Sequence, residues 1–481
     1  MLRKLEKNET INTSMFGGFS PFWSWIGEQV YIADTAEEII QVVPKDKRIL
    51  NTSSFFELMQ FNYILGDSTL FQGVYRMPWH AELSHKGVIK KPPIPHGNKL
   101  VSPKDSARQL QLLLEEELKQ VVTGSETVYL LLTGGLDSRV IAGVLKKIEP
   151  KLTCKIKCAT WGQDNSRDVV YAKRIANGYN WEFVHIPYTA ELLWENIERG
   201  AIWGASEVAG IHLHGMDWFK NIKKDDLVIA ASFGDSIGRA EFSSVHLSQV
   251  KLDKITNKHR LIHPSLVDDL IGQASKDRSR AWEGEVSTHS WVKCELDQQE
   301  NYMRRMLCHI MNYIRQFGKL HQAFTSDKVV EYMWSITPEC RNDDVYFEIL
   351  KNLDQRLYSL PWARNGIAPD GTKETDESLK KNYHDWEKWM RTDLKEKLEP
   401  LYFSKELDEL NLFNPIAKKH LWETWQKEGP EAFGKGQDIV KVCSLELTRR
   451  NYLLKADHRK TKQIDVVYDL IKYGVERILK R

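Results

Sequence analysis

The chain has 481 residues, of which 42% are hydrophobic, so it is long enough to form two or three domains that each bury a core. Its 68 Lys and Arg residues nearly balance 66 Asp and Glu residues, and the net charge of +2 gives no electrostatic reason to expect nucleic acid or an anionic membrane as a partner. A small molecule is the substrate class that this balance favours.

The six cysteines are spread along the chain without a CxxC pair, which is typical of a protein from a reducing compartment. No run approaches the roughly 20 apolar residues that a membrane helix needs. The first residues, MLRKLEKNETINTS, are too polar for a signal peptide. We therefore expect a cytoplasmic protein.

Residues 1–97 are the first predicted unit. Short apolar pieces such as QVYIAD and FFELMQFNYIL alternate there with turn-forming residues, which favours a small α+β unit. The Pro-rich connector KKPPIPHG, Lys90 to Gly97, marks its end.

Residues 98–250 are predicted to form an α/β core. Ser102 is placed to cap a helix that has Pro103 in its first position. The apolar runs TVYLLLT, LTCKIKCATW, WEFVHIPY and DLVIAASF then alternate with helices that begin near Ser138, Asn165 and Thr189. This alternation predicts a parallel sheet with helices on both faces, with ligands bound beyond the carboxyl ends of its strands.

Residues 251–481 have a mainly helical pattern without a clear strand. The last segment, IDVVYDLIKYGVERILKR, carries a helical apolar stripe from Ile464 to Ile478.

The stretch VYLLLTGGLDSRVIAGVLKK, Val128 to Lys147, predicts a phosphate-binding turn. Gly134 and Gly135 let backbone N–H groups approach an anion at the positive end of the following helix, and Thr133 and Ser138 add hydroxyl donors. A turn that merely packs the strand on the helix is the structural alternative.

Asp137 is an acid beside this anion site, which makes sense if Mg²⁺ lies between the carboxylate and the phosphates. The spacing differs from that of the usual P-loop, because the turn contains no lysine.

The turn resembles the Ser-Gly-Gly-x-Asp-Ser signature of the ATP-pyrophosphatase, or PP-loop, superfamily, with Thr133 in place of the first Ser. The run Gly-Gly-Leu-Asp-Ser-Arg and its helix are similar to the synthetase domain of asparagine synthetases. ATWGQDNSRDVVYAKRIA from Ala159 and GDSIGR from Gly234 extend this resemblance. YILGDSTLFQGVYRMP from Tyr63 resembles the end of the family's glutaminase domain.

The resemblance implies ATP and Mg²⁺ as cofactors. Asp137 and Asp235 would hold Mg²⁺ on the pyrophosphate, although a helix N-cap is a local alternative for Asp235. Leu131, Trp161 and Gly162 would lie against the adenine.

Arg341 follows SITPEC in a segment that resembles the family's Pro-x-x-x-Lys/Arg, and it would contact the pyrophosphate if it is not simply a surface residue. Glu207, His212 and His214 lie where the family has substrate contacts, which makes them candidate acids or bases. We do not expect zinc there, because no cysteine or third histidine is near in sequence.

Two features depart from the family. Residue 2 is Leu where glutamine-dependent members have the nucleophilic Cys, so residues 1–97 would be a shortened glutaminase-like unit without that activity. Ser232 and Ser236 stand where an ungapped match puts two Glu residues, and Ser232 becomes a candidate ATP contact. The loss of the first Glu puts aspartate in doubt as the substrate.

The resemblance implies an ATP-dependent ligase that activates a small-molecule carboxylate as an acyl-AMP, releases pyrophosphate and forms an amide with ammonia or an amine. Free ammonia or a separate glutaminase would supply the nitrogen. Two alternatives stay open: an intramolecular amide former of the lasso-peptide or β-lactam cyclase type, and a non-catalytic ATP-binding homologue.

Overall fold

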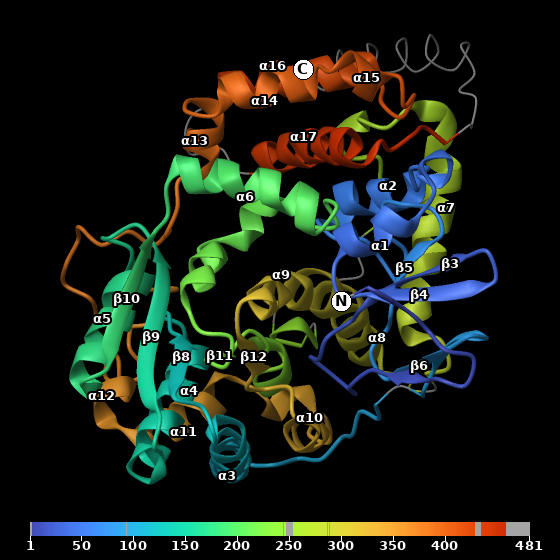
Figure 1. Ribbon diagram of the computed structural model, residues 1–481. Coiled ribbons are helices and arrows are strands. Elements are labelled where there is room, and N and C mark those ends of the chain that lie inside the picture. The colour runs from blue at the N-terminus through green and yellow to red at the C-terminus, as the bar shows by residue number, and fades with distance from the viewer. Residues whose placement is uncertain are drawn as a thin grey trace.

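The computed structural model describes residues 2–92, 94–243, 245–246, 254–285, 287, 289–428 and 434–457. A parallel five-stranded sheet with the order β10-β9-β8-β11-β12 organises the part of the molecule drawn at the lower left of Figure 1. Its strands are β8 (Thr127–Leu131), β9 (Lys155–Gly162), β10 (Glu182–Pro187), β11 (Leu227–Ala230) and β12 (Lys319–Gln322).

Strand β12 corrects the prediction that no strand follows residue 251. It pairs in parallel with β11 and forms one edge of the sheet. Its sequence, KLHQ, has a single apolar residue, Leu320, because an edge strand need not be apolar on both faces. A search for apolar runs therefore could not find it.

Helices α3 (Pro103–Val122), α4 (Leu136–Ile148), α5 (Arg167–Tyr179) and α6 (Ala190–Trp203) connect or flank the strands, as predicted. The hydroxyls of Ser102, Ser166 and Thr189 each accept a hydrogen bond from a backbone N–H in the first turn of α3, α5 and α6. Such caps satisfy donors that the helix itself leaves free, and they fix where each helix begins.

Both faces of the sheet are buried. Val128 and Leu130 of β8 pack in one cluster with residues of α3, α4, α5 and α11 (Asp343–Leu353). Tyr129 and Leu131 point to the other face, where Ala230 and Met311 belong to the same cluster. The α/β class with a parallel, two-sided sheet is therefore confirmed.

Residues 3–90 contain two antiparallel sheets and two helices. One sheet has the order β1-β4-β3-β5 and the other the order β2-β6-β7. The elements are β1 (Arg3–Lys4), β2 (Ile11–Asn12), β3 (Phe22–Ile26), β4 (Gln29–Ala33), α1 (Ala36–Val42), α2 (Thr52–Phe61), β5 (Val74–Arg76), β6 (Ala81–Ser84) and β7 (Gly87–Lys90).

The chain after β11 is mainly helical, as predicted. Its remaining α-helices are α7 (Pro264–Ser279), α8 (Ser290–Asp297), α9 (His309–Met311), α10 (Asp327–Trp334), α12 (Gln355–Tyr358), α13 (Trp386–Arg391), α14 (Lys395–Tyr402), α15 (Lys405–Asp408), α16 (Pro415–Lys427) and α17 (Lys435–Tyr452). The predicted stripe from Ile464 to Ile478 lies outside the described residues. None of the helices in the described ranges is long and apolar enough to cross a membrane.

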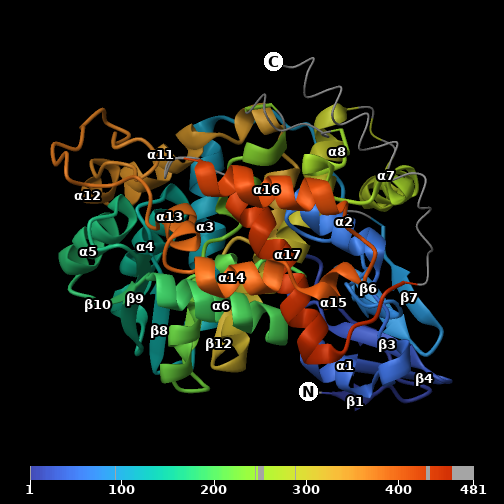
Figure 2. The same cartoon turned by 90° about the horizontal axis from the view of Figure 1, so that it is seen from above.

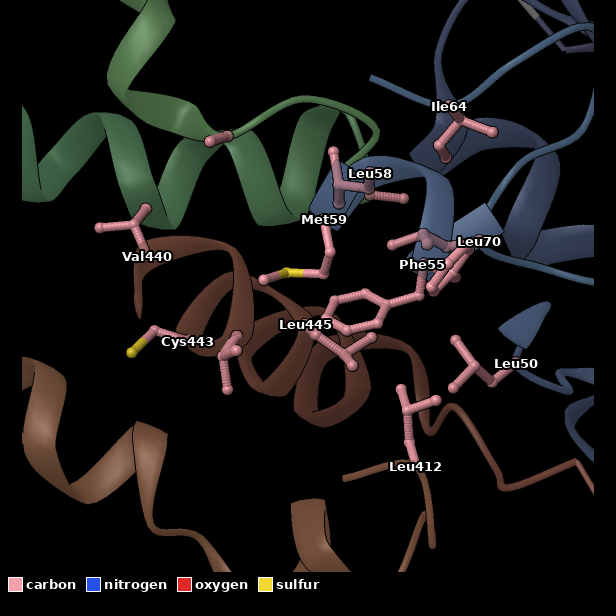
Figure 3. Packing of buried hydrophobic residues seen from close by; sticks show 14 of the residues in the cluster. Leu50, Phe55, Leu58, Met59, Ile64, Leu70, Leu412, Val440, Cys443 and Leu445 are labelled. Atoms are coloured by element: carbon pink, nitrogen blue, oxygen red, sulfur yellow. The ribbon is translucent and has the colours of Figure 1, made fainter. Parts of the chain in front are cut away.

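One hydrophobic core joins the two ends of the described chain. Figure 3 shows Phe55 and Met59 of α2 beside Val440 and Leu445 of α17, and all four belong to one buried cluster. Seen from above in Figure 2, α17 lies between α2 and the pair α6 and α14, and it contacts all three. The N-terminal elements therefore share their core with the C-terminal helices, and the division at residues 97 and 250 stays a prediction.

Candidate active site

The turn between β8 and α4 is held open toward the carboxyl end of the sheet. The backbone N–H of Thr133 donates to Ser138 Oγ at 3.1 Å, and the N–H of Gly135 donates to Thr133 Oγ1 at 3.1 Å. No side chain caps the start of α4 at Leu136. The first N–H groups of this helix are therefore free to meet an anion.

The two glycines of the turn have different tasks. A Cβ on Gly134 would lie 2.7 Å from the Cβ of Ala363, and its N–H donates to Asp168 Oδ1 at 3.0 Å. Burial raises the pKa of Asp168 to about 6. Gly134 therefore permits close packing against Ala363 and is not part of the cavity lining, whereas Gly135 lines the cavity.

Arg139 fixes the backbone of the turn from the interior of the protein. Its fully buried guanidinium donates to the carbonyl of Gly134 at 3.0 Å and to those of Leu360 and Pro361 at 2.6 and 2.9 Å. The sequence placed Arg next to the signature but gave no distant partner for it, because Leu360 and Pro361 are more than 200 residues away along the chain.

Asp137 and Asp235 lie close together at the ends of neighbouring strands. Asp235 is on a π-helical turn, Gly234–Gly238, that follows β11, and a Cβ on Gly234 would lie 2.7 Å from the Cβ of Asp137. Burial and the charge of Asp137 raise the pKa of Asp235 to about 7. Burial also raises the pKa of Asp137.

This pair fits Mg²⁺. Two desolvated carboxylates that disfavour each other's charge are stabilised by a cation between or beside them. The described residues include no group of three or more His, Cys, Asp or Glu side chains placed to hold a metal. Phosphate oxygens and water would complete the coordination, which is the usual arrangement for Mg²⁺.

Arg239 is the cation that neutralises Asp137 in the structure. Its Nε and Nη2 atoms lie 3.2 Å from the two carboxylate oxygens of Asp137, and Nη1 lies 2.7 Å from Asp343 Oδ1. Glu241 Oε2 lies 3.5 Å from Nη2 of the same guanidinium. Arg239 is the last residue of the GDSIGR motif, and the sequence alone gave it no role.

Arg341 does not reach the cavity. It is fully buried, and its Nη2 atom lies 2.7 and 2.9 Å from the carboxylate oxygens of Glu295. Nε donates to the carbonyl of Ile336 at 3.1 Å. The guanidinium is thus engaged by α8 and the chain after α10, so it is neither at the predicted pyrophosphate position nor on the surface.

A cavity of about 500 Å³ opens at the carboxyl ends of β8, β9 and β11. It gathers most of the predicted ATP contacts: Leu131, Thr133, Gly135, Asp137, Ser138, Trp161 and Ser232. Gly162 is not in its lining. A Cβ there would lie 2.9 Å from Tyr383 Cβ, and its φ of +140° favours glycine, so Gly162 permits close packing instead.

Three histidines and two tryptophans form one wall, here called the aromatic wall: Trp161, His212, His214, His384 and Trp386. Trp161 stacks on His214 with ring centres 5.6 Å apart, and His384 stacks on Trp386 at 3.5 Å. Burial lowers the pKa of His212 to about 3 and that of His384 to about 4, so these imidazoles are neutral at neutral pH. The sequence could not assign His384 and Trp386, which come from a distant loop and helix.

Glu207 lies outside the cavity. It is buried 3.4 Å from Arg305, with Arg76 at 3.9 Å, and burial raises the pKa of its carboxyl. This position does not support the predicted acid or base role for Glu207, whereas His212 and His214 do face the cavity.

A second wall, here called the methionine wall, consists of Tyr302, Met306, Leu307, Ile310 and Met311. The first three come from a π-helical segment, Gln298–Cys308, and the last two from α9. Long π-helical segments are rare, and short ones occur often at functional sites.

Comparison with known proteins gives one family match. Residues 109–210 match the model of the family described as asparagine synthase. This segment contains the phosphate turn, strands β8, β9 and β10 and the helices between them. It includes neither residues 1–97 nor Asp235. No curated protein matches the chain significantly.

Two solved structures are similar to parts of the chain. An NMN synthetase from Francisella tularensis is 16% identical over 30% of this chain and 60% of its own, with a TM-score of 0.20. The U34-tRNA thiolase NcsA from Methanococcus maripaludis is 11% identical over 53% of this chain and 80% of its own, with a TM-score of 0.19. The chain thus spans less than two thirds of that synthetase, and at these TM-scores the assignment of the site depends on its own geometry.

Proposed function

We propose that the protein is an ATP-dependent ligase that activates a carboxylate as an acyl-AMP and then forms an amide with ammonia or an amine. The observation that carries the proposal is a cavity lined by the uncapped start of α4, the hydroxyls of Thr133 and Ser138 and the carboxylate of Asp137. Asp235 is not part of this lining but lies close enough to Asp137 for that charge to raise its pKa. The match of residues 109–210 to the asparagine synthase model supports ATP use and ligase chemistry in general.

In the proposed first step, a carboxylate oxygen of the substrate attacks the α-phosphorus of ATP. The bond from this phosphorus to its bridging oxygen breaks, and pyrophosphate leaves with the electron pair. Asp137 and Asp235 would hold Mg²⁺, which neutralises charge on the leaving group. The N-terminus of α4 and the hydroxyls of Thr133 and Ser138 would bind the phosphates before the reaction, so their dipoles need no reorganisation.

Arg239 would change partners in this step. With its carboxylate engaged in holding Mg²⁺, Asp137 would no longer pair with the guanidinium as it does in the structure. The guanidinium remains tied to Asp343 at 2.7 Å, from where it would donate to the departing pyrophosphate. This is the role that the sequence analysis gave to Arg341.

In the second step, the amine attacks the acyl carbonyl, AMP leaves, and the nitrogen loses a proton. Free ammonia or a separate glutaminase in the cytoplasm would supply the nitrogen. An amine within the same substrate would instead give a cyclic product, as in the cyclase alternative.

One observation favours the non-catalytic alternative, namely the ion pair between Arg239 and Asp137. If this pair never opened, Asp137 would not be available to Mg²⁺.

The test is to incubate the protein with Mg²⁺, ATP, ammonium and carboxylic acids including aspartate, and to assay AMP, pyrophosphate and the mass of the product. We expect AMP and pyrophosphate in equal amounts from the wild type and about 100-fold less from Asp137→Asn. Cyclisation loses water, whereas ammonia addition also adds nitrogen. Equal turnover by Asp137→Asn would contradict the proposal, and nucleotide binding without AMP for every acid and amine would favour the non-catalytic alternative.

A further inference from the structure

The charge of the cavity limits which acid it accepts. Among the described residues that line it, Asp137 is the only Asp, Glu, Lys or Arg. Burial keeps His212, His214 and His384 neutral. No Lys or Arg is part of this lining, so a second carboxylate on the substrate would have no countercharge.

An amino acid such as aspartate would bring an ammonium group and two carboxylates into this space. One carboxylate reacts with ATP, but the other two charges would lose their hydration. Desolvation of an unpaired charge is costly, and enzymes that bind charged amino acids offset it with ion pairs. Asp137 does not offer such a pair, because Arg239 holds it in the structure and Mg²⁺ would hold it during the reaction.

The two walls suit different parts of the reacting complex. In the aromatic wall, the nearly parallel rings of Trp161 and His214 lie at an angle of 8°. One buried ring nitrogen each of His212, His214 and His384 has no hydrogen-bond partner among the residues that the structure describes. Flat faces and free donors or acceptors suit a nucleobase. That assignment leaves the methionine wall for the acyl group, and its residues Met306, Ile310 and Met311 pack in one cluster with Leu131 and Ala230.

We infer that the acyl substrate is a hydrophobic monocarboxylic acid whose carbon chain packs on Met306, Ile310 and Met311 while its single carboxylate faces the phosphate turn. This inference rests on the proposed function. Methionine side chains are flexible and polarisable, so this wall can adapt to acids of different shape. The π-helical segment turns Tyr302 and Met306 toward the cavity, consistent with a site that departs from regular helix geometry for binding.

A binding experiment tests the acid without requiring catalysis. Calorimetric titration of the full chain, saturated with Mg²⁺ and a non-hydrolysable ATP analogue, would compare octanoate and phenylacetate with L-aspartate. We expect at least one of the two hydrophobic acids to bind about tenfold or more tightly than aspartate.

Variants at Met306 locate the site. Met306→Lys adds a buried cation and should weaken binding of the hydrophobic acid by about tenfold or more. The matched control Met306→Leu keeps the volume and should change it by less than about threefold. Binding of the ATP analogue to each variant shows that the phosphate turn is intact.

Three results would overturn the inference: aspartate binds as tightly as the hydrophobic acids, no hydrophobic acid binds although the analogue does, or Met306→Lys leaves the affinity unchanged. ATP–pyrophosphate exchange with the same acids separates this inference from the proposed function. Exchange with aspartate alone would overturn the inference and keep the ligase. Hydrophobic acids that bind as expected without exchange for any acid would support the acid site and overturn the ligase.

Discussion

Arg239 is the residue on which the proposed chemistry most depends beyond the carboxylate pair. Its side chain is 5% exposed and contacts Asp137, Asp343 and Glu241. Arg239→Gln removes the cation proposed to meet the leaving pyrophosphate, so we expect kcat for AMP formation to fall about 100-fold. Initial rates with saturating Mg²⁺, ATP and acid measure this.

Arg364 offers a matched control for that change. Its side chain is 48% exposed and forms an ion pair with Glu241 at 3.1 Å. Surface pairs contribute little, so Arg364→Gln should leave kcat within about twofold and the unfolding free energy within about 1 kcal/mol. A folded Arg239→Gln variant with wild-type kcat would show that Arg239 only packs beside Asp137.

Because His384 is buried in its neutral form, we expect the free energy of unfolding to depend on pH. The pKa of His384 is lowered from 6.5 to about 4 by burial, so between these values the unfolded chain binds a proton that the folded chain excludes. This contribution to the unfolding free energy is fully present above pH 6.5 and is lost as the pH falls toward 4. Its slope is at most about 1.4 kcal/mol per pH unit.

His384→Phe should make that part of the pH dependence disappear. Denaturant titrations at pH 7, 6 and 5 would show the wild type losing more stability than the variant over this range. Parallel curves would mean that His384 is protonated equally in both states and that burial does not lower its pKa.

The sequence allowed us to predict residues that belong to a local motif, but not residues whose roles depend on contacts with distant parts of the chain. Thr133, Gly135, Asp137 and Ser138 form a continuous turn, so their pattern could be read directly. Asp168, from a different helix, accepts a hydrogen bond from the turn, and Arg139 ties the turn to the carbonyls of Leu360 and Pro361. The sequence could not reveal that Arg341 pairs with the buried Glu295, because that partner lies on a different helix.

At the scale of elements, α2 and α17 pack in one hydrophobic core that could not be predicted from a local sequence pattern. Phe55 is fully buried in the cluster that also contains Leu445. Phe55→Ala should therefore lower the unfolding free energy by about 3–5 kcal/mol, whereas Leu112→Ala, at a site that is 49% exposed, should change it by less than about 0.5 kcal/mol. Chemical denaturation followed by tryptophan fluorescence measures both.

The shape of that transition carries further information. Since the N-terminal and C-terminal elements share one cluster, fluorescence and circular dichroism should report coincident loss of structure. A separate early transition that Phe55→Ala shifts alone would indicate that the N-terminal elements unfold independently.

Elements were predictable where their sequence is regular. The apolar runs of β8 to β11 and the hydroxyl caps of α3, α5 and α6 identified most of the sheet and its helices. Strand β12 was missed because its edge position requires few apolar residues. The methionine wall was missed because a π-helical segment has no familiar periodicity.

At the scale of the whole molecule, the carboxyl ends of the strands, the π-helical segment and the loop before α13 converge on one cavity. Its lining residues come from six separate stretches of the chain: 131–138, 161, 212–216, 230–232, 302–311 and 383–386. The phosphate turn is one short stretch and could be recognised in the sequence, whereas the methionine wall could not. The central proposal for this cavity is that a carboxylate attacks the α-phosphate of ATP there.

The most direct test uses a carboxylic acid labelled with ¹⁸O in its carboxylate, chosen from those that support ATP–pyrophosphate exchange or, failing that, from those that bind. Mass spectrometry of the nucleotide after turnover with Mg²⁺, ATP and ammonium measures where the label goes. The account predicts one ¹⁸O atom in AMP for each amide formed. Unlabelled AMP, or ADP and phosphate as the products, would contradict it.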